Sequence, residues 1–354
     1  MRKLLIMLCL AAAACGPQSS GQVGEERTAG VPEMPPGQFE DAALPPLPSG
    51  AGLSLLQAQV ALDRAGFSPG VIEGKATPAF QAALRAFQQA KGLLQTGELD
   101  AATRTALPDG RAIPPLRSIK LPANFLMGPY TPDIPRDLSA QAGLPVLGYR
   151  NALEKLAERF HTTTAYLLEL NNPATLMRAG SVIRVPNIPD PPLASVPGAD
   201  AQWNNTLAML GISSKQPRAA LVEVDRSEGV LKAFDGAGKL IAQFPATMGS
   251  RQDPLPLGDW TIEGVSRNPP FHYNPKLFWD AASTDRKSVL GPGPNGPVGV
   301  VWIELSKPHY GIHGTPEPAL IGQSESHGCI RLSNWDAARL AQMLRPGVRA
   351  TFKA

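Results

Sequence analysis

The sequence has little cysteine, few aromatic residues and almost no excess charge. Three cysteines occur among 354 residues, aromatic residues make up 6%, and the formal net charge is +3. Two of those positive charges, Arg2 and Lys3, lie at the start of the chain, so bulk charge does not support nucleic-acid binding. Hydrophobic residues make up 43%, which is enough for packed cores, and the length allows roughly two or three domains.

The chain also lacks a long apolar run near its start. The run over residues 4–14 is much shorter than the about 20 residues that a membrane-spanning helix needs. A basic start, a short apolar run and small residues are typical of a secretory signal, so we predict a signal peptide over residues 1–14. The alanines before Cys15 resemble a bacterial lipobox, although Ala12 stands where leucine is usual.

The lipobox resemblance implies that Cys15 is lipidated, and Gly16 after it favours sorting to the outer membrane. We therefore expect a periplasmic, lipid-anchored protein that faces the cell wall; cleavage with Cys15 as a bystander is the alternative. Cys9 leaves with the signal peptide and Cys15 is blocked, so Cys329 remains without an intramolecular partner. An unpaired cysteine in an oxidising compartment is a liability unless it is used.

Proline marks the boundaries between three pieces of the chain. It is concentrated in residues 31–50, 108–135 and 186–197, and such segments are typical of semi-rigid linkers. We predict the following organisation: a proline-rich tether over 15–50, a helical domain over 51–108, a linker over 109–143, a second unit over 144–188, a linker over 189–216 and a third domain over 217–354.

The first piece has the signals of three helices. Ser54 and Gln57 fit a capping box, Thr77-Pro78 fits an N-cap followed by proline at the first helical position, and Asp100 fits the cap of a last short helix. The order of Ala65–Gly74, Phe80–Gln88 and Gly92–Gly97 resembles the small peptidoglycan-binding domain of cell-wall enzymes. The alternative is an unrelated three-helix module.

The second piece combines two short helical patterns with a closing strand. Leu153, Leu156 and Phe160 have helical spacing, a second helix ends at Asn171, and residues 180–186 read as a strand. This order resembles LysM, a βααβ glycan-binding unit, with Gly143–Gly148 in place of its usual opening strand. The resemblance implies glycan binding, with a simple spacer as the alternative.

The third piece switches to the periodicity of strands. Residues 219–225, 230–234 and 239–244 read as strands, and Asp235–Gly238 has the chemistry of a hairpin turn. Ser333 and Asp336 fit the cap of one late helix. The expected fold is multidomain α+β: a small three-helix domain, a βααβ unit and a mostly-β, β-sandwich-like domain.

A histidine and the unpaired cysteine stand close together in this third piece. An imidazole beside a thiol can act as its general base and turn it into a nucleophile. His313 precedes Cys329 by sixteen positions, which is enough to return on a neighbouring strand or loop. Gly328 allows close approach of a substrate, and Arg331 suits a carboxylate. From spacing alone, a catalytic thiol and a buried core cysteine remain equally open.

The motif His313-Gly-Thr, followed by Ser326-His-Gly-Cys-Ile-Arg-Leu332, resembles the signature of the L,D-transpeptidase (YkuD-type) catalytic family. The resemblance implies that Cys329 is the nucleophile and His313 the general base. It also implies that Ser326, His327 and Gly328 form the loop around the nucleophile and its oxyanion site. Arg331 matches the arginine after the nucleophile; substrate contact and a structural ion pair remain open for it, as a structural loop role does for His327.

The activity that the family implies is peptidoglycan L,D-transpeptidation. Cys329 forms a thioacyl-enzyme on a stem tetrapeptide, D-Ala leaves, and an acceptor amine resolves the thioester into a 3→3 cross-link. Carboxypeptidation and attachment or release of a wall protein use the same chemistry, and a non-catalytic tether that binds murein is the rival of another class. The implied partners are stem peptides, glycan and, through the anchor, a membrane, and the oligomeric state stays open.

No metal or organic cofactor is implied. Zinc held by His309, His313, His327 and Cys329 is an alternative, but the first two histidines lie in a strand-like stretch rather than on one helix face. Tyr273, Trp302 and His309 are further candidates for the cleft, although single aromatic residues are more often part of a core.

Overall fold

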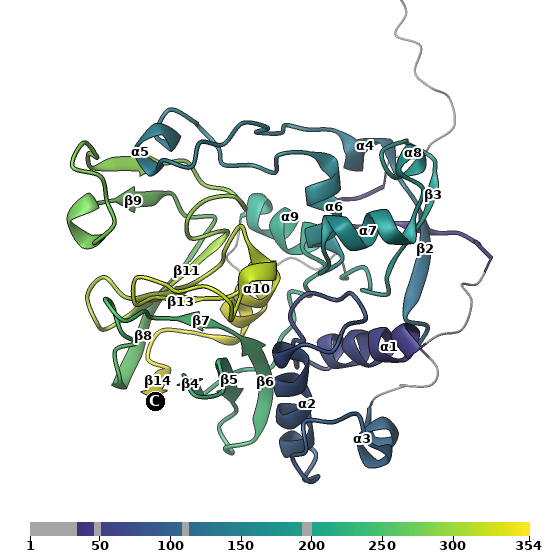
Figure 1. Ribbon diagram of the computed structural model, residues 1–354, viewed down its shortest axis with the longest axis horizontal. Helices are drawn as coiled ribbons and strands as arrows, with labels where there is room; N and C mark the ends of the chain where they lie inside the picture. The colour runs from purple at the N-terminus through teal and green to yellow at the C-terminus, as the bar shows by residue number, and fades with distance from the viewer. Residues whose placement is uncertain (1–33, 46–50, 108–112, 193–199) are drawn as a thin grey trace, which may run out of the picture. The chain divides into compact units, whose positions relative to one another are not determined.

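A computed structural model of the protein describes residues 34–45, 51–107, 113–192 and 200–354 (Figure 1). The expected signal peptide and Cys15 lie outside the described residues. All described residues belong to one unit, Pro32–Ala354. Within them, no helix has the length and apolar character needed to cross a membrane.

The first piece folds into three helices, as predicted: α1 (Ala51–Arg64), α2 (Pro78–Ala90) and α3 (Ala101–Ala106). Thr77 accepts a hydrogen bond from the Phe80 amide and Asp100 accepts one from the Thr103 amide, which confirms both predicted caps. The capping box at Ser54 is wrong, because α1 already begins at Ala51 and Ser54 lies inside it.

The second region pairs three strands and packs short helices on them. Its elements are β1 (Glu40–Asp41), β2 (Leu116–Lys120), α4 (Ala123–Leu126), α5 (Leu138–Gln141), α6 (Ala152–Arg159), α7 (Thr164–Leu170), α8 (Pro173–Leu176) and β3 (Val182–Pro186). Strand β2 lies between β1 and β3 and is antiparallel to both. The helices α6 and α7 and the strand β3 agree with the predicted pattern, and the LysM-like identity stays a prediction.

Three boundaries differ from the prediction. The expected linker 109–143 contains β2, α4 and α5, so the strand that opens the unit is Leu116–Lys120 rather than Gly143–Gly148. The reason is that Ile119 and Leu121 bury completely in the core of this region. The high proline content of this segment predicted a linker, although it contains the five-residue strand β2.

The expected tether 15–50 is also packed in its later part. Phe39 is buried, with its ring 5.1 Å from Phe125 and 5.3 Å from Phe160. Residues 189–216, expected as a linker, contain α9 (Ala201–Met209), which Asp200 caps and whose Trp203 is 1% exposed. Large apolar side chains at single positions hold both segments against the cores.

The third piece forms a nine-stranded sheet in the described residues, with the order β6-β5-β4-β14-β8-β11-β12-β13-β7. Its elements and the short hairpin beside it are β4 (Leu221–Asp225), β5 (Val230–Phe234), β6 (Leu240–Pro245), β7 (Thr247–Met248), β8 (Gly258–Arg267), β9 (Phe271–Tyr273), η1 (Pro275–Leu277), β10 (Ser288–Leu290), β11 (Val301–Leu305), β12 (Gly311–His313), η2 (Pro318–Leu320), β13 (Ile330–Arg331), α10 (Asn334–Met343) and β14 (Arg349–Lys353).

Strand pairing is continuous through this sheet from one edge strand to the other. The ten-residue strand β8 joins its halves, pairing with β14 through its first part and with β11 through its second. The predicted hairpin β5–β6 is confirmed, and so is the Ser333 cap of α10. One apolar core contains residues of α10 and of both halves of the sheet.

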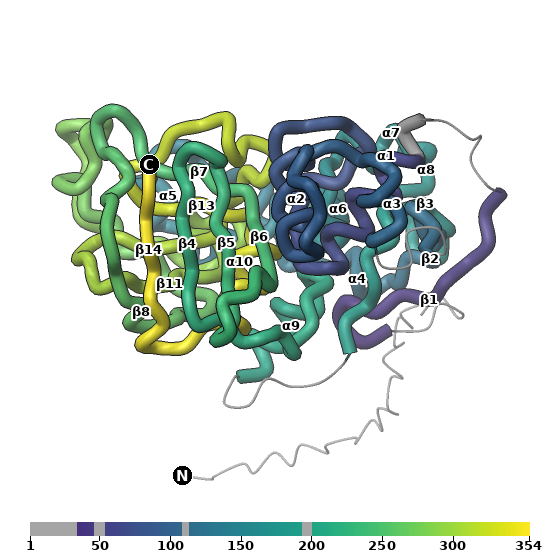
Figure 2. Tube along the Cα trace, turned by 90° about the horizontal axis from the view of Figure 1, so that it is seen from below, coloured from purple at the N-terminus to yellow at the C-terminus, as the bar shows by residue number. Residues whose placement is uncertain are grey.

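The helical domain lies against the edge of this sheet, where α2 is beside β6 (Figure 2). The segment at Phe67 continues the sheet as a bridge to Gln243. Polar contacts are buried at the same junction: Ser68 donates to Asp336 at 2.8 Å, and Arg339 pairs with Asp63 at 3.2 Å. The domains therefore share a buried interface, and linkers do not separate them.

Asp63 is the centre of that junction. His161 Nδ1 lies 3.1 Å from its carboxylate, and the His161 ring stacks on Trp335 at 5.0 Å. Burial raises the pKa of Asp63, but the charges and hydrogen bonds of Arg339 and His161 lower it more, so the net pKa is well below its ordinary value. Its charge is thus compensated from the other two regions of the chain.

We expect Asp63→Asn to destabilise the protein by about 3–5 kcal/mol, because Arg339 would keep a buried and uncompensated charge. Asp41→Asn is the matched control, since Asp41 pairs with Arg117 at the surface and such pairs contribute about 0–1 kcal/mol. Denaturant unfolding measures both variants. Equal stability of the two would contradict the assignment of Asp63 as a junction residue.

Candidate active site

The sequence-predicted pair lies on adjacent strands at one end of the sheet. Strands β12 and β13 are parallel, with Ile312 opposite Ile330 and His313 opposite Arg331. Both isoleucines point into the core, and side chains alternate along a strand. His313, Arg331 and Cys329 therefore share the opposite face, where they line one cleft. The structure thus brings the predicted residues together.

The loop before Cys329 is held by Ser326. Its hydroxyl donates to the Cys329 carbonyl at 2.6 Å and accepts from the Gly249 amide at 2.7 Å, while its own amide donates to the Gly249 carbonyl. Ser326 is 3% exposed, so it fixes the loop from behind. Gly328 has φ +89°, and a Cβ there would lie 2.5 Å from the Tyr310 ring. Only glycine fits this close turn.

His313 is buried and its tautomer follows from its contact. Nδ1 lies 2.7 Å from the Gly314 carbonyl, which can only accept, so Nδ1 carries the proton and Nε2 keeps its lone pair. The ring stacks on Trp302, at 5.7 Å between centroids. Burial lowers the pKa of His313, and the positive charge of Arg331 lowers it further, to about 4. The imidazole is therefore neutral at ordinary pH.

Cys329 is neutral at rest as well. Burial raises the pKa of the thiol. A hydrogen bond with the Gly311 backbone and the charge of Arg331 lower it by less, so the net pKa lies above its ordinary value. Its Sγ donates to the His309 carbonyl at 3.8 Å. Among the described residues, no acceptor takes the backbone N–H of Gly328 or of Cys329. These two amides are free to bind a developing negative charge beside the sulfur.

Arg331 and His327 have different surroundings. Arg331 donates to the Glu325 carbonyl at 3.2 Å, and burial lowers the pKa of its guanidinium. His327 Nε2 pairs with Asp280 at 2.8 Å, and its ring contacts that of Phe278 at 4.9 Å. His327 therefore joins the nucleophile loop to the segment after β9, which agrees with the structural loop role that the sequence left open.

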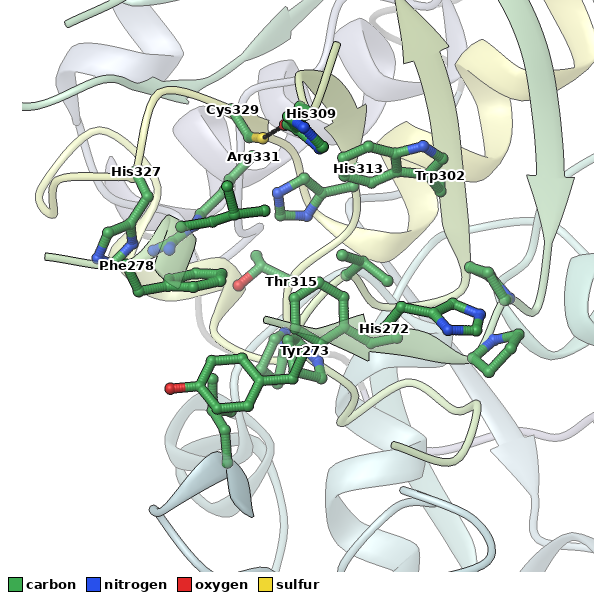
Figure 3. Close-up of a pocket in the computed structure, with 18 of the residues that line it drawn as sticks. His272, Tyr273, Phe278, Trp302, His309, His313, Thr315, His327, Cys329 and Arg331 are labelled. Atoms are coloured by element: carbon green, nitrogen blue, oxygen red, sulfur yellow. Dashed lines mark hydrogen bonds between the residues drawn. The ribbon is translucent and has the colours of Figure 1, made fainter. Parts of the chain in front are cut away.

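The cleft has a volume of about 1220 Å³. In Figure 3, Cys329, His309 and Arg331 lie along one side, while Phe278, Tyr273 and His272 lie across from them. Tyr273, Trp302 and His309, which the sequence offered only as further candidates, all line it. Burial and a hydrogen bond to Asp285 raise the pKa of Tyr273 to about 12, so its phenol stays protonated.

Asn334 packs against Gly314, the residue after His313, and no sequence signal indicated this contact. A Cβ on Gly299 or Gly314 would lie about 2 Å from the Asn334 amide oxygen, so both glycines make room for this side chain. The amide donates to Glu158 of α6 at 2.8 Å and accepts from the Val300 amide at 3.2 Å. Burial raises the pKa of Glu158 to about 7.

The zinc alternative finds no support in the site. Within the described ranges, no three His, Cys, Asp or Glu side chains cluster as metal ligands. His309 has φ +69° and contributes its carbonyl to Cys329. Nε2 of His327 is paired with the carboxylate of Asp280.

Comparison with known proteins identifies the family. The L,D-transpeptidase catalytic domain (YkuD) matches residues 219–351, and the family described as "Putative peptidoglycan binding domain" matches residues 52–107. A Bacillus subtilis protein named "Putative L,D-transpeptidase YkuD" is 30% identical over 204 residues, which cover 57% of this chain and 93% of that protein. The chain belongs to the L,D-transpeptidase family.

Solved structures of L,D-transpeptidases are also similar. One from Mycobacterium smegmatis has 21% identity and a TM-score of 0.32, and the match covers 38% of this chain and 59% of that one. One from Xylanimonas cellulosilytica has 16% identity and a TM-score of 0.34, with 88% of this chain and all of that chain covered. The two family models, which match residues 219–351 and 52–107, confirm the predicted catalytic and peptidoglycan-binding domains at the level of family.

We expect Ser326→Ala to lower stability by about 1–3 kcal/mol, because the buried Gly249 amide loses its acceptor. The freed loop should also make Cys329 react faster with iodoacetamide. Ser324→Ala is the matched control from the same loop, since Ser324 is exposed. Denaturant unfolding and the alkylation rate measure both variants, and identical behaviour would contradict a holding role for Ser326.

Proposed function

We propose that this protein is a peptidoglycan L,D-transpeptidase that forms 3→3 cross-links through a thioacyl-enzyme on Cys329. The observation that carries the proposal is the face shared by His313, Cys329 and Arg331 in one cleft. Membership of the family and the peptidoglycan-binding match support the same substrate. The proposed donor is a stem tetrapeptide that ends in D-Ala.

In the proposed acylation, Nε2 of His313 accepts the thiol proton as Sγ attacks the carbonyl before D-Ala. A neutral imidazole suits this role, because its lone pair is free and its partner is a thiol rather than a thiolate. The free amides of Gly328 and Cys329 stabilise the oxyanion. The C–N bond then breaks, His313 returns the proton to the leaving amine, and D-Ala departs from the thioester.

Deacylation reverses the proton path. The amine of an acceptor stem attacks the thioester carbonyl and gives a proton to His313, the C–S bond breaks, and the thiol is regenerated. Arg331 is placed beside both reacting groups, where it suits a substrate carboxylate. Its positive charge also keeps the pKa of His313 low.

The remaining regions place the enzyme at the wall. We propose that residues 51–108 bind peptidoglycan, that the unit closed by β3 binds glycan, and that Cys15 carries a lipid anchor on the periplasmic side of the outer membrane. Since residues 51–107 and the unit closed by β3 share buried contacts with the catalytic domain, they would hold the cleft close to the wall that they bind.

The direct test mixes the full chain with purified disaccharide-tetrapeptide, beside a Cys329→Ala control, and identifies products by mass spectrometry. The proposal expects a Cys329-dependent dimer that lacks one D-Ala. Tripeptide monomer alone would instead mean a carboxypeptidase. No product from folded protein would favour the non-catalytic tether.

The pH at which the acylation rate falls on the acid side of the pH–rate profile (the acid limb) should be unusually low. His313 must be neutral to accept a proton, so we expect the rate of Cys329 acylation to stay constant as pH falls through 6.5 and to drop only near the His313 pKa of about 4. In Arg331→Gln the limb should move upward, because the loss of positive charge raises that pKa. A wild-type limb near 6.5, measured by stopped-flow mass analysis, would contradict this mechanism.

A further inference from the structure

The wall of the cleft that faces the β9 hairpin does not come from the catalytic sheet alone. Arg136, Asp137 and Leu138 line the same cleft as Cys329 and His313. They belong to residues 128–150, which connect α4 to α6 and which we call the arm. Figure 1 shows its helix α5 beside β9. The arm thus reaches the active site from the second region of the chain.

The arm is firmly attached where it meets the catalytic domain. The Leu147 amide donates to the Pro292 carbonyl at 2.9 Å, and the Asn295 amide returns a bond to the Leu147 carbonyl at 2.9 Å. The side chain of Asn295 adds a bond to the Gly148 carbonyl at 2.8 Å. At Gly293, a Cβ would lie 2.2 Å from the Leu147 carbonyl oxygen, so the glycine permits this approach.

The apolar side chains of the arm continue the attachment toward the cleft. Leu147 is fully buried in a small core with Tyr273 and Leu290 of the hairpin, and Leu138 packs against the same core. The position of the arm is therefore part of the folded structure.

Arg136 stands on this wall with its backbone held on both sides. The Pro135 carbonyl accepts a bond from Gln141 Nε2 at 2.8 Å, and the Asp137 carboxylate accepts the Ala140 amide at 2.7 Å as the cap of α5. Among the described residues, the Arg136 guanidinium itself has no hydrogen-bond or ion-pair partner, and it is exposed to the cleft. The neighbouring Asp137 carboxylate is engaged by the helix that it caps.

We infer that Arg136 is a substrate-binding residue that binds a carboxylate of the stem peptide. The arm then forms a second subsite for an anionic group in the active site. A guanidinium with no internal partner keeps all its donors for a carboxylate, which it can bind through two hydrogen bonds, and the held backbone fixes the point from which it reaches. Arg331 stands beside Cys329 and Arg267 also lines the cleft, so the arm adds a guanidinium to those of the catalytic domain. Its volume of about 1220 Å³ has room for an extended peptide.

This inference rests on the proposed function for its ligand and deepens it. It makes peptide recognition depend on a segment outside the family's matched catalytic residues 219–351. A stem peptide carries several carboxylates, so substrates with one carboxylate converted to carboxamide at a time identify the one that Arg136 holds.

The test measures binding of disaccharide-tetrapeptide to the full chain carrying Cys329→Ala, by calorimetry. Added Arg136→Gln should weaken binding by about 5- to 30-fold, the effect of one solvent-accessible charge-assisted contact. Arg226→Gln is the matched control, because Arg226 is an exposed arginine in the turn between β4 and β5, outside the cleft. One of the carboxamide peptides should bind the Cys329→Ala protein more weakly than the unmodified peptide does, by the same factor. The protein that also carries Arg136→Gln should bind that carboxamide peptide and the unmodified peptide equally well.

Kinetics on the chain with its cysteine separate this inference from the proposed function. Arg136→Gln should raise KM by the same factor and leave kcat nearly unchanged. Product formation with a KM equal to that of Arg226→Gln would overturn the subsite and leave the function intact. Arg136-dependent peptide binding by a protein that yields no acylated product would support the subsite and overturn the transpeptidase.

Discussion

The buried amide of Asn334 joins three distant segments next to the site through hydrogen bonds with Val300, Pro294 and Glu158. This side chain fills the space that Gly299 and Gly314 leave open, and the Gly314 carbonyl sets the tautomer of His313. The same amide donates to Glu158 in the second region of the chain. One side chain at the beginning of α10 thus connects the segments around the candidate base with the second region of the chain.

Burial decides the protonation of the reacting pair. Low accessibility disfavours charge on His313 and on Cys329 alike, and Arg331 opposes a positive imidazole while favouring a thiolate. The resting site is therefore uncharged at the two reacting atoms, and charge develops only as the sulfur attacks. Free backbone amides beside the sulfur are then most useful, because they act on charge that appears in the transition state.

Local signals predicted what is local in the structure, including the caps at Thr77 and Ser333, the β5–β6 hairpin, and the motif that contains Cys329. The features that the sequence did not predict are contacts between distant parts of the chain. Strand β2 pairs with β3 across more than sixty residues, and Glu158 meets Asn334 across 176. The periodicity of a sequence does not indicate which distant residues will pair. The proline-rich composition predicted linkers in two segments that are held in place by single buried side chains, Phe39 and Trp203.

In the proposed mechanism, Cys329 carries the acyl group inside a cleft that the arm helps to line. The most direct measurement incubates the full chain with disaccharide-tetrapeptide, quenches in acid to preserve a thioester, and locates the adduct by peptide mapping. We expect a mass increase equal to the donor minus D-Ala on the peptide that contains Cys329. An adduct on another residue, or a cross-linked product made by Cys329→Ala, would contradict the account.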